Sequence, residues 1–291
     1  MVKSNYKKDN GELWVSIVVY AVIIFATIVC LAPFLRVFSQ ALSADKYVMS
    51  GSITLFPKGF TLKHMKFVMD SFQFRRSLLV SVTSTLVYTF ISMIFTIMTA
   101  YPLSRKIRGR KWMMFFIVFT MMFNGGIIPT YLVVSKVGLL NNFWSLIIPR
   151  LLSAYNIIIL ITSFRALPVE FEEAARIDGA GHFRTLWQIM VPLVKPTLAV
   201  LLLYYAIFRW NSWFDALLYV DDVNLLVLPL FVRNVIQSGN SAISNIIRTE
   251  PSPTVSVQAA AVIFSMLPIL VLYPFLQKYF VKGVMIGGIK G

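Results

Sequence analysis

A chain of 291 residues in which 58% are hydrophobic and only 13% are charged differs from a soluble domain, where charged residues make up about 25%. Its net charge of +15 would suit a nucleic-acid-binding protein, but the basic residues gather in short connections between long apolar runs, where they set membrane topology. The single cysteine, Cys30, excludes an intrachain disulfide. Composition therefore predicts a polytopic membrane protein that binds no nucleic acid.

Six apolar segments approach the roughly 20 residues that a helix needs to cross about 30 Å of hydrocarbon. They are residues 13–35, 77–101, 112–134, 143–163, 194–214 and 256–276. The first is longer than the apolar core of a secretory signal, typically about 7–15 residues, so we expect it to remain as a spanning helix. Arg150 and Arg209 interrupt the fourth and fifth segments, and charges at that depth generally face a cavity or the bundle interior. The expected fold is all-α.

Basic residues in the connections predict the orientation of these helices. The two tails, the connection after the second segment and the loop around Pro168, counted from Arg165 to Lys195, together carry 15 Lys and Arg residues, against ten on the opposite side. Seven of those ten lie in the long connection 36–76, which dilutes their influence. We therefore expect cytoplasmic tails at 1–12 and 277–291, flanking a six-helix transmembrane domain at 13–276 that includes the cytoplasmic loop 164–193.

The loop 164–193 carries two helical patterns. Pro168 suits the first helical position, and Gly179 is a natural stop. Acidic residues in the first turns complement the positive end of the helix dipole: Glu170, Glu172 and Glu173. Phe171, Ala174 and Ala175 share one face, which the alanines leave flat enough for another protein. A second pattern follows in Phe183, Leu186, Trp187 and Met190. On pattern alone, an ordinary interfacial hairpin fits equally well.

The spacing within this loop carries a resemblance to a known motif. Glu173, Ala174, Ala175, Gly179, Ile189 and Pro192 follow the pattern EAA-x3-G-x9-I-x-L-P, with Val191 in place of the Leu. The loop thus resembles the EAA loop of ATP-binding-cassette (ABC) importer permeases. Residues 124–131, 138–144, 209–214 and 277–283 look like carbohydrate-uptake permeases of the maltose type, most like the oligosaccharide branch of Gram-positive bacteria.

The resemblance implies a type I importer in a bacterial cell membrane. In this family the permease pairs with a second, different permease, two cytoplasmic ATPase subunits power the pair, and an extracellular solute-binding protein delivers the oligosaccharide. The chain has no G-x4-GK[ST] phosphate loop, so ATP and Mg would be bound by the partner ATPase and no cofactor by this chain. By its position, the long outer connection 215–255 corresponds to the loop that can reach into the binding protein.

The resemblance also implies which residues couple transport to ATP hydrolysis. In the family, the Glu at the position of Glu173 sits in a cleft of the ATPase, and Ala174, Ala175 and Gly179 seat the helix. The expected ATPase-coupling residues are Glu172, Glu173, Ala174, Ala175, Asp178, Gly179, Ile189 and Pro192.

Two groups of residues have the chemistry of a sugar pathway, since sugars are held by hydrogen bonds to their hydroxyls and by aromatic faces. The first is Arg150, Tyr155 and Asn156; the second is Arg209, Trp210, Asn211 and Trp213. The tryptophans also suit interface anchors. Arg209 also suits snorkelling or pairing with Asp215. Arg150 lies roughly 10 Å into its span, which favours a cavity-facing or partner-pairing role. Two arginines would suit an acidic oligosaccharide or carboxylates of the second permease.

Two other classes of function are less well supported. A transporter driven by an ion gradient needs a carboxylate at membrane depth, but all 12 Asp and Glu residues lie in tails or connections. A membrane-embedded enzyme would need paired carboxylates or clustered metal ligands. Both histidines lie in connections, where we expect His64 to be solvated and His182 to lie on the polar side of the loop. The identity of the sugar does not follow from the sequence.

Overall fold

The structure is a computed structural model that describes residues 10–238 and 255–287. Helices dominate both ranges, and the one pairing of extended backbone there is an isolated bridge between Ser43 and Phe60. The predicted all-α class is therefore confirmed. Residues 1–9 and 288–291 of the predicted tails, and residues 239–254 of the long connection 215–255, lie outside the described residues.

Two compact units make up the chain: Met1–Asp70 with Val235–Phe264, and Ser71–Asn234 with Ser265–Gly291. The first contains α1 (Asn10–Ala41), α2 (Asp45–Met49), α3 (Lys63–Asp70) and the beginning of α14 (Val255–Gly287). From Trp14 to Ala41, α1 is long and apolar enough to cross a membrane, as predicted for its first part.

His64 is buried in the first unit, with 4% of its surface exposed, so the expectation of a solvated histidine is wrong. The reason is that α3 turns His64 and Val68, one helical turn apart, toward the interior. His64 Nε2 lies 3.6 Å from Asp45 Oδ1, which also accepts a 2.8 Å hydrogen bond from Ser256 Oγ. A charge-bearing connection can therefore form a buried polar junction.

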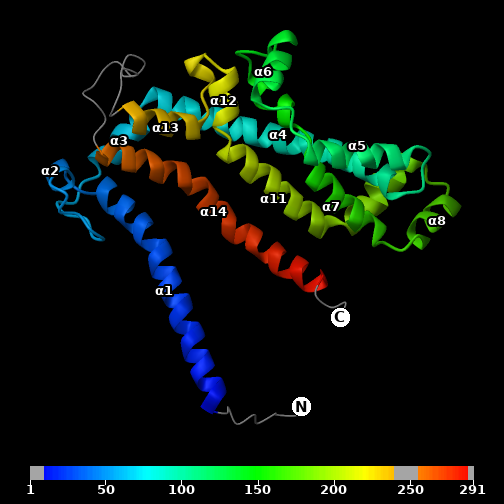
Figure 1. Cartoon of the computed structure of the whole chain (residues 1–291), viewed down its shortest axis with the longest axis horizontal. Coiled ribbons are helices and arrows are strands. Elements are labelled where there is room, and N and C mark those ends of the chain that lie inside the picture. Colours follow the sequence, from blue (N-terminus) through cyan, green and yellow to red (C-terminus); the bar gives the residue numbers. More distant parts are fainter. Residues whose placement is uncertain (1–9, 239–254, 288–291) are drawn as a thin grey trace. The chain divides into compact units, whose positions relative to one another are not determined.

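The second unit is a bundle built around α4 (Phe72–Ser104) (Figure 1). Its other elements are α5 (Arg110–Met122), α6 (Ile127–Lys136), η1 (Phe143–Leu146), η2 (Ile148–Arg150), α7 (Ala154–Arg165), α8 (Glu170–Ile177), α9 (His182–Arg184), η3 (Thr185–Met190), α10 (Val191–Leu193), α11 (Lys195–Asn211), α12 (Phe214–Tyr219), η4 (Val223–Leu225), most of α13 (Leu228–Ser238) and the later part of α14. The predicted outer connection is thus largely helical from 214 to 238.

Two of the predicted spans are bent rather than straight. The third breaks by 116° between α5 and α6, and the fourth by 55° between η2 and α7. A further bend of 86° joins the helical end of the loop, His182–Leu193, to α11, so it lies where the fifth predicted span begins. Gly126 at the first break has a φ of 91°, a conformation that glycine adopts readily. With each bent pair taken as one crossing, the described residues hold up to five candidate spans. Six crossings, the last within α14, stay a prediction for the whole chain.

The α4 helix packs against both α7 and α11 through a face of small polar side chains (Figure 1). Its buried members include Ser77, Ser81, Ser84, Ser92 and Thr96. Small residues let membrane helices approach closely. Tyr88 and Tyr205 meet edge to face in the same core, 5.9 Å between ring centroids. These contacts hold together the helices that carry the candidate site.

Candidate functional site

The predicted loop helix is present as α8, and Gly179 ends it as expected. The amide of Ala180 donates to the carbonyl of Ala175 (2.9 Å), and the amide of Gly179 to that of Arg176 (3.0 Å). These two bonds form a Schellman motif, in which the residue after the cap takes the left-handed conformation. Gly179 has a φ of 73°, and a Cβ there would meet no atom within 4 Å. Glycine is therefore favoured at this position by backbone conformation and not by lack of space.

The two alanines of α8 do not share the flat, exposed face that the sequence predicts. Ala175 is 2% exposed and packs inside its own chain, whereas Glu173 and Ala174 are exposed. Helical geometry separates adjacent residues by about 100°, so neighbours such as these two alanines can face different ways. A partner protein can therefore reach Glu173 and Ala174, while Ala175 seats the helix on the bundle.

Apolar side chains surround the outer face of α8. Val169 and Phe171 are exposed, and 86% of the Ile177 surface is exposed. Asp178 and Gly179 are exposed beside them. Exposed apolar residues that gather in one place mark a surface made for contact.

The later motif residues have a different environment. Ile189 packs against the core cluster that contains Leu186 and Met190, and Pro192 is half-buried. The segment Thr185–Met190 forms a π-helix, a rare conformation that is frequent at functional sites. The structure thus places Ile189 and Pro192 where they fix the second half of the loop.

Glu172 turns away from this outer face. Its Oε1 lies 2.6 Å from Arg105 Nε, and the two side chains are 12% and 20% exposed. Arg105 also lies over the ring of Tyr101, 5.7 Å from its centroid. Since Arg105 follows the last residue of α4, this ion pair ties the loop helix to the end of a predicted span. Nothing in the sequence signals the pair, whose members lie 67 positions apart.

A polar cleft of about 720 Å³ opens in the same unit and brings together one of the two predicted sugar-binding groups. Arg150, Tyr155 and Asn156 line it, together with Asn124 and Tyr204. Arg150 Nε lies 3.2 Å from Asp215 Oδ1, an ion pair within this chain. The hydroxyl of Tyr88 donates to the Arg150 carbonyl at 2.7 Å. The cleft thus offers a cation, amides and aromatic rings at a break between helices.

The second predicted group does not line this cleft. Arg209 is 2% exposed, and its Nε and one Nη are buried without a hydrogen-bond partner among the described residues. It neither snorkels nor forms the suggested ion pair, because Asp215 pairs with Arg150. Asn211 donates to its own helix, at the Ile207 carbonyl. Arg209 and Asn211 do not line the cleft, and sugar contact by either residue stays a prediction.

The tryptophans of that group are also engaged elsewhere. Trp210 Nε1 donates to the Ser265 carbonyl at 3.3 Å. The guanidinium carbon of Arg233 lies 4.2 Å from the centroid of Trp213. Trp144, suggested as an interface anchor, is partly exposed. Trp210 and Trp213 thus contact different parts of their own chain, and a shared sugar site from residue 209 to 213 stays a prediction.

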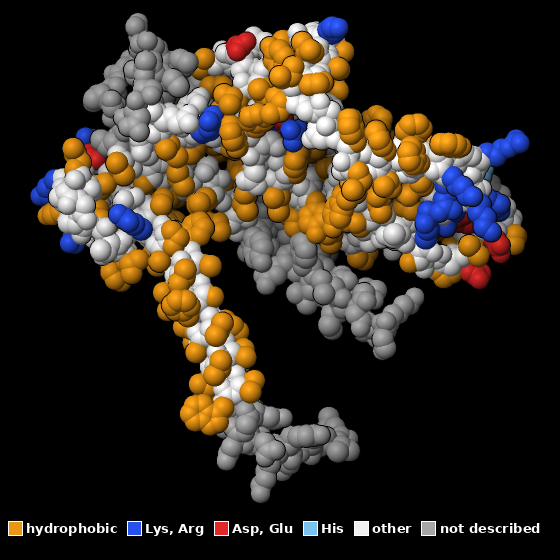
Figure 2. Space-filling model, in the orientation of Figure 1, with side chains coloured by type: hydrophobic (Ala, Val, Ile, Leu, Met, Phe, Trp, Pro, Cys, Tyr) orange, Lys and Arg blue, Asp and Glu red, His pale blue; other side chains and the backbone are white. Residues whose placement is uncertain are grey.

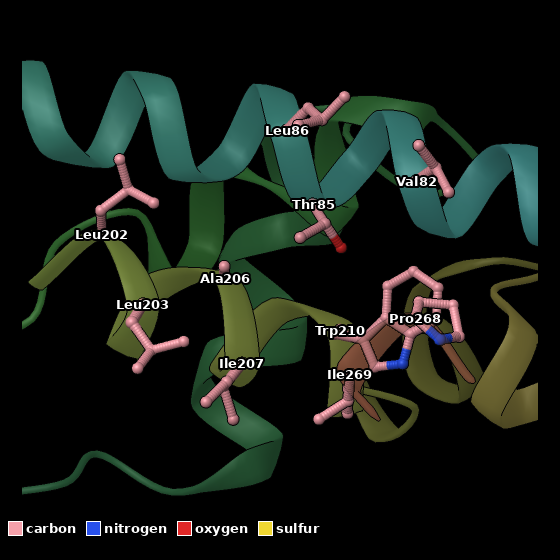
Figure 3. Close-up of a pocket in the computed structure, with 10 residues that line it drawn as sticks. All are labelled: Val82, Thr85, Leu86, Leu202, Leu203, Ala206, Ile207, Trp210, Pro268 and Ile269. Atoms are coloured by element: carbon pink, nitrogen blue, oxygen red, sulfur yellow. The ribbon is translucent and has the colours of Figure 1, made fainter. Parts of the chain in front are cut away.

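An apolar groove of about 220 Å³ lies between α4, α11 and α14 in the same unit (Figure 3). Val82, Leu86, Leu202 and Ile207 are among the residues that line it, and Thr85 contributes a hydroxyl (Figure 3). A pathway for sugars needs polar groups to replace water, which this groove lacks. The polar cleft is therefore the candidate pathway. Among the described side chains, no three metal-ligating groups come together in a cluster able to hold a metal ion.

Comparison with known proteins gives a family and several relatives. A family model described as "Binding-protein-dependent transport system inner membrane component" matches residues 92–286. The chain is 38% identical to "Protein LplC" of Bacillus subtilis, over 90% of each chain. It is 35% identical to the "Polygalacturonan/rhamnogalacturonan transport system permease protein YtcP" of the same organism, over 94% of this chain and 97% of the relative.

Solved structures of bacterial ABC transporters also match this chain. A chain of a bacterial ABC transporter "involved in the import of the acidic polysaccharide alginate" matches with a TM-score of 0.87 and 31% identity, over 94% of this chain and 98% of that one. A chain of an alginate ABC transporter in complex with alginate pentasaccharide-bound periplasmic protein matches with a TM-score of 0.59 and 16% identity, which shows the fold alone.

Proposed function

Because the chain belongs to the family of binding-protein-dependent transport system inner membrane components, and is a transport subunit and not an enzyme, we propose that it imports acidic oligosaccharides. It forms one half of the translocation pathway, and a second, homologous permease forms the other. Two ABC ATPase subunits bind ATP and Mg and drive the pair, while this chain binds no cofactor. An extracellular solute-binding protein delivers the sugar.

The polar cleft is the observation that carries the proposed substrate. Arg150, Tyr155 and Asn156 present a guanidinium, a phenol and an amide in one cavity, which suits ligands with many hydroxyls and a carboxylate. The Arg150 side chain is largely exposed although it pairs with Asp215, so a substrate carboxylate can reach it. Two similar proteins are named for polygalacturonan/rhamnogalacturonan transport and alginate import, whose substrates are acidic glycans.

The outer face of α8 supports the proposed attachment to an ATPase. Glu173 and Ala174 are exposed there, and the apolar side chains of Phe171 and Ile177 border them. This combination of an apolar rim with accessible carboxylates suits docking into a cleft that supplies a cation. In the proposed arrangement the chain crosses a bacterial cell membrane several times, with both termini and α8 in the cytoplasm and the connection 215–255 facing the binding protein.

Uptake by the complete importer tests the proposed substrate. The two permeases, the ATPases and the binding protein are reconstituted in vesicles, and entry of galacturonate oligosaccharides is compared with entry of neutral oligosaccharides of equal length. We expect Arg150→Gln to reduce acidic uptake about tenfold or more, the scale of one charge-assisted hydrogen bond, while Arg150→Lys retains part of it. Assembly and basal ATPase activity serve as controls. Uptake restricted to neutral sugars would reject an acidic substrate.

A further inference from the structure

A second polar cavity lies at the other end of α4, under the loop helix. It has a volume of about 480 Å³. Its lining comprises Met98, Tyr101, Pro102, Arg105, Lys106, Ile107, Glu172, Arg176, His182, Phe183, Leu186 and Trp187. We call this cavity the basic pocket. Figure 2 shows Lys and Arg side chains gathered at this end of the unit, around a few acidic ones.

Positive charge exceeds negative charge in the basic pocket. Arg105, Lys106 and Arg176 line it against one carboxylate, Glu172, which is already paired with Arg105. Lys106 and Arg176 form no ion pair within the described residues. His182 adds a further group that is able to carry a positive charge. The pocket therefore attracts an anion.

Two hydrogen-bond donors of the pocket are left without an acceptor. Arg105 Nη2 and the indole Nε1 of Trp187 are buried, and neither has a partner in the described part of the chain. Buried N–H groups are rarely left unpaired, because each loses its bond to water on burial. The residues that carry these donors come from different elements, the end of α4 and η3, and both residues line one cavity. A ligand with several acceptor oxygens would satisfy both.

The remaining walls are apolar and lie where a span ends. Met98 and Pro102 belong to the last turns of α4, which is long and apolar enough to cross a membrane and ends at Ser104. Phe183 and Ile107 are exposed at the same cavity. A ligand here has an anionic head in the pocket and hydrocarbon beside it, as an anionic lipid does. Basic pockets between helices at the cytoplasmic surface are a known environment for such headgroups.

We propose that the basic pocket binds the phosphate headgroup of an anionic lipid, from the leaflet at the predicted cytoplasmic surface. The phosphate oxygens accept from Arg105 Nη2 and Trp187 Nε1, and Lys106 and Arg176 balance the charge. Because Arg105 and Glu172 join α4 to α8 at this pocket, the lipid strengthens the seat of the loop helix. The lipid composition of the membrane then tunes how firmly α8 is held.

Retention of lipid by the intact importer tests this site. The complete complex is reconstituted in vesicles of phosphatidylcholine, or of phosphatidylcholine mixed with phosphatidylglycerol, then extracted and examined by native mass spectrometry. Trp187→Phe removes the indole donor and keeps an aromatic ring, and Lys106→Gln removes an exposed charge. Lys111→Gln, in the same basic connection but outside the pocket lining, is the matched control. Co-purification of the ATPase subunits verifies assembly of each variant.

We expect wild type to retain phosphatidylglycerol in preference to phosphatidylcholine, and each pocket variant to weaken that retention about tenfold, the factor that corresponds to 1.4 kcal/mol. The Lys111→Gln complex should match wild type. Equal retention by assembled wild-type and pocket-variant complexes would overturn the proposal. Inorganic phosphate is added in a second arm: if it binds with the same sensitivity to both variants while phosphatidylglycerol does not, the ligand is a free anion and the lipid assignment is wrong.

Discussion

Breaking the ion pair between Arg105 and Glu172 should loosen α8 from the end of α4 without unfolding the bundle. The pair has a 2.6 Å contact and side chains only 20% and 12% exposed, so it is weakened by water less than a surface pair. Hydrogen bonds that involve charged groups contribute about 1.5–3 kcal/mol. Taking the lower end for partial exposure, loss of the pair changes the ratio of seated to unseated α8 roughly tenfold.

Sugar transported per ATP hydrolysed is the quantity that reports this loss. In vesicles containing the complete importer, Glu172→Gln and Arg105→Gln should each lower that ratio, because α8 then moves with the ATPase without carrying α4. The exchanged pair, Arg105→Glu with Glu172→Arg, should recover part of it. Glu170→Gln, an exposed glutamate in the same helix, is the control and should behave as wild type.

A double-mutant cycle separates this reasoning from a general loss of stability. If the pair acts as one unit, the effects of the two single substitutions are not additive, and the second substitution costs little once the first is made. Additive effects, or an unchanged ratio of transport to hydrolysis in both single variants, would refute the role assigned to the pair. Thermal unfolding of each complex shows whether the bundle itself is intact.

Two further predictions concern the seat of α8. Gly179→Ala should destabilise the loop by about 1–2 kcal/mol, the cost of a left-handed conformation with a Cβ, and reduce ATPase-coupled uptake; Gly179→Asn should be milder, since Asn tolerates that region. Limited proteolysis of the loop measures the change. A Gly179→Ala loop that is cut no faster than the wild-type loop would contradict the prediction. Ala175→Leu should cost about 1–3 kcal/mol through overpacking, detected as a lower Tm. Ala174→Leu, on the exposed side, should leave Tm unchanged and weaken ATPase co-purification; equal Tm loss in both would contradict the assignment of faces.

Local signals predicted the loop helix well. The acidic first turn and Gly179 each act within a few residues, and the structure has the left-handed glycine where the sequence places it. Pro168, predicted at the first helical position, instead lies two residues before Glu170, the first residue of α8. The same signals do not show which alanine faces the bundle, because that depends on where the neighbouring helices lie. The contact between Arg105 and Glu172 could not be predicted from the sequence either, because it depends on how the end of α4 lies against α8.

Apolar length predicted the membrane segments but not their shape. The third segment reads as a continuous hydrocarbon stretch, yet its helix breaks by 116° at Gly125 and Gly126. Hydropathy measures how much apolar surface a segment carries and is blind to the direction of the backbone. The breaks matter for the candidate site, because Asn124 and Gly125, in the break that follows α5, line the cleft.

The two membrane arginines illustrate the remaining limit of composition. Arg150 and Arg209 interrupt similar apolar runs, but Arg150 lines a cleft and pairs with Asp215, whereas Arg209 is enclosed by the bundle. Their difference arises from helix rotation and from the bend before α7, which no local pattern near either residue encodes. An arginine within a span is a candidate site by default, and the tertiary structure decides which one ligands reach.

The α4 helix connects the two ends at which this chain would act. At one end, Arg105 holds Glu172 of α8. Further along, the Tyr88 hydroxyl donates to the carbonyl of Arg150, whose side chain lines the cleft and pairs with Asp215. A displacement of α8 that moves α4 therefore reaches the backbone of Arg150 through a single helix and one hydrogen bond. Coupling between binding sites is reciprocal, so if the two ends are coupled through α4, a sugar that changes the Arg150–Asp215 pair would also bias the position of α8.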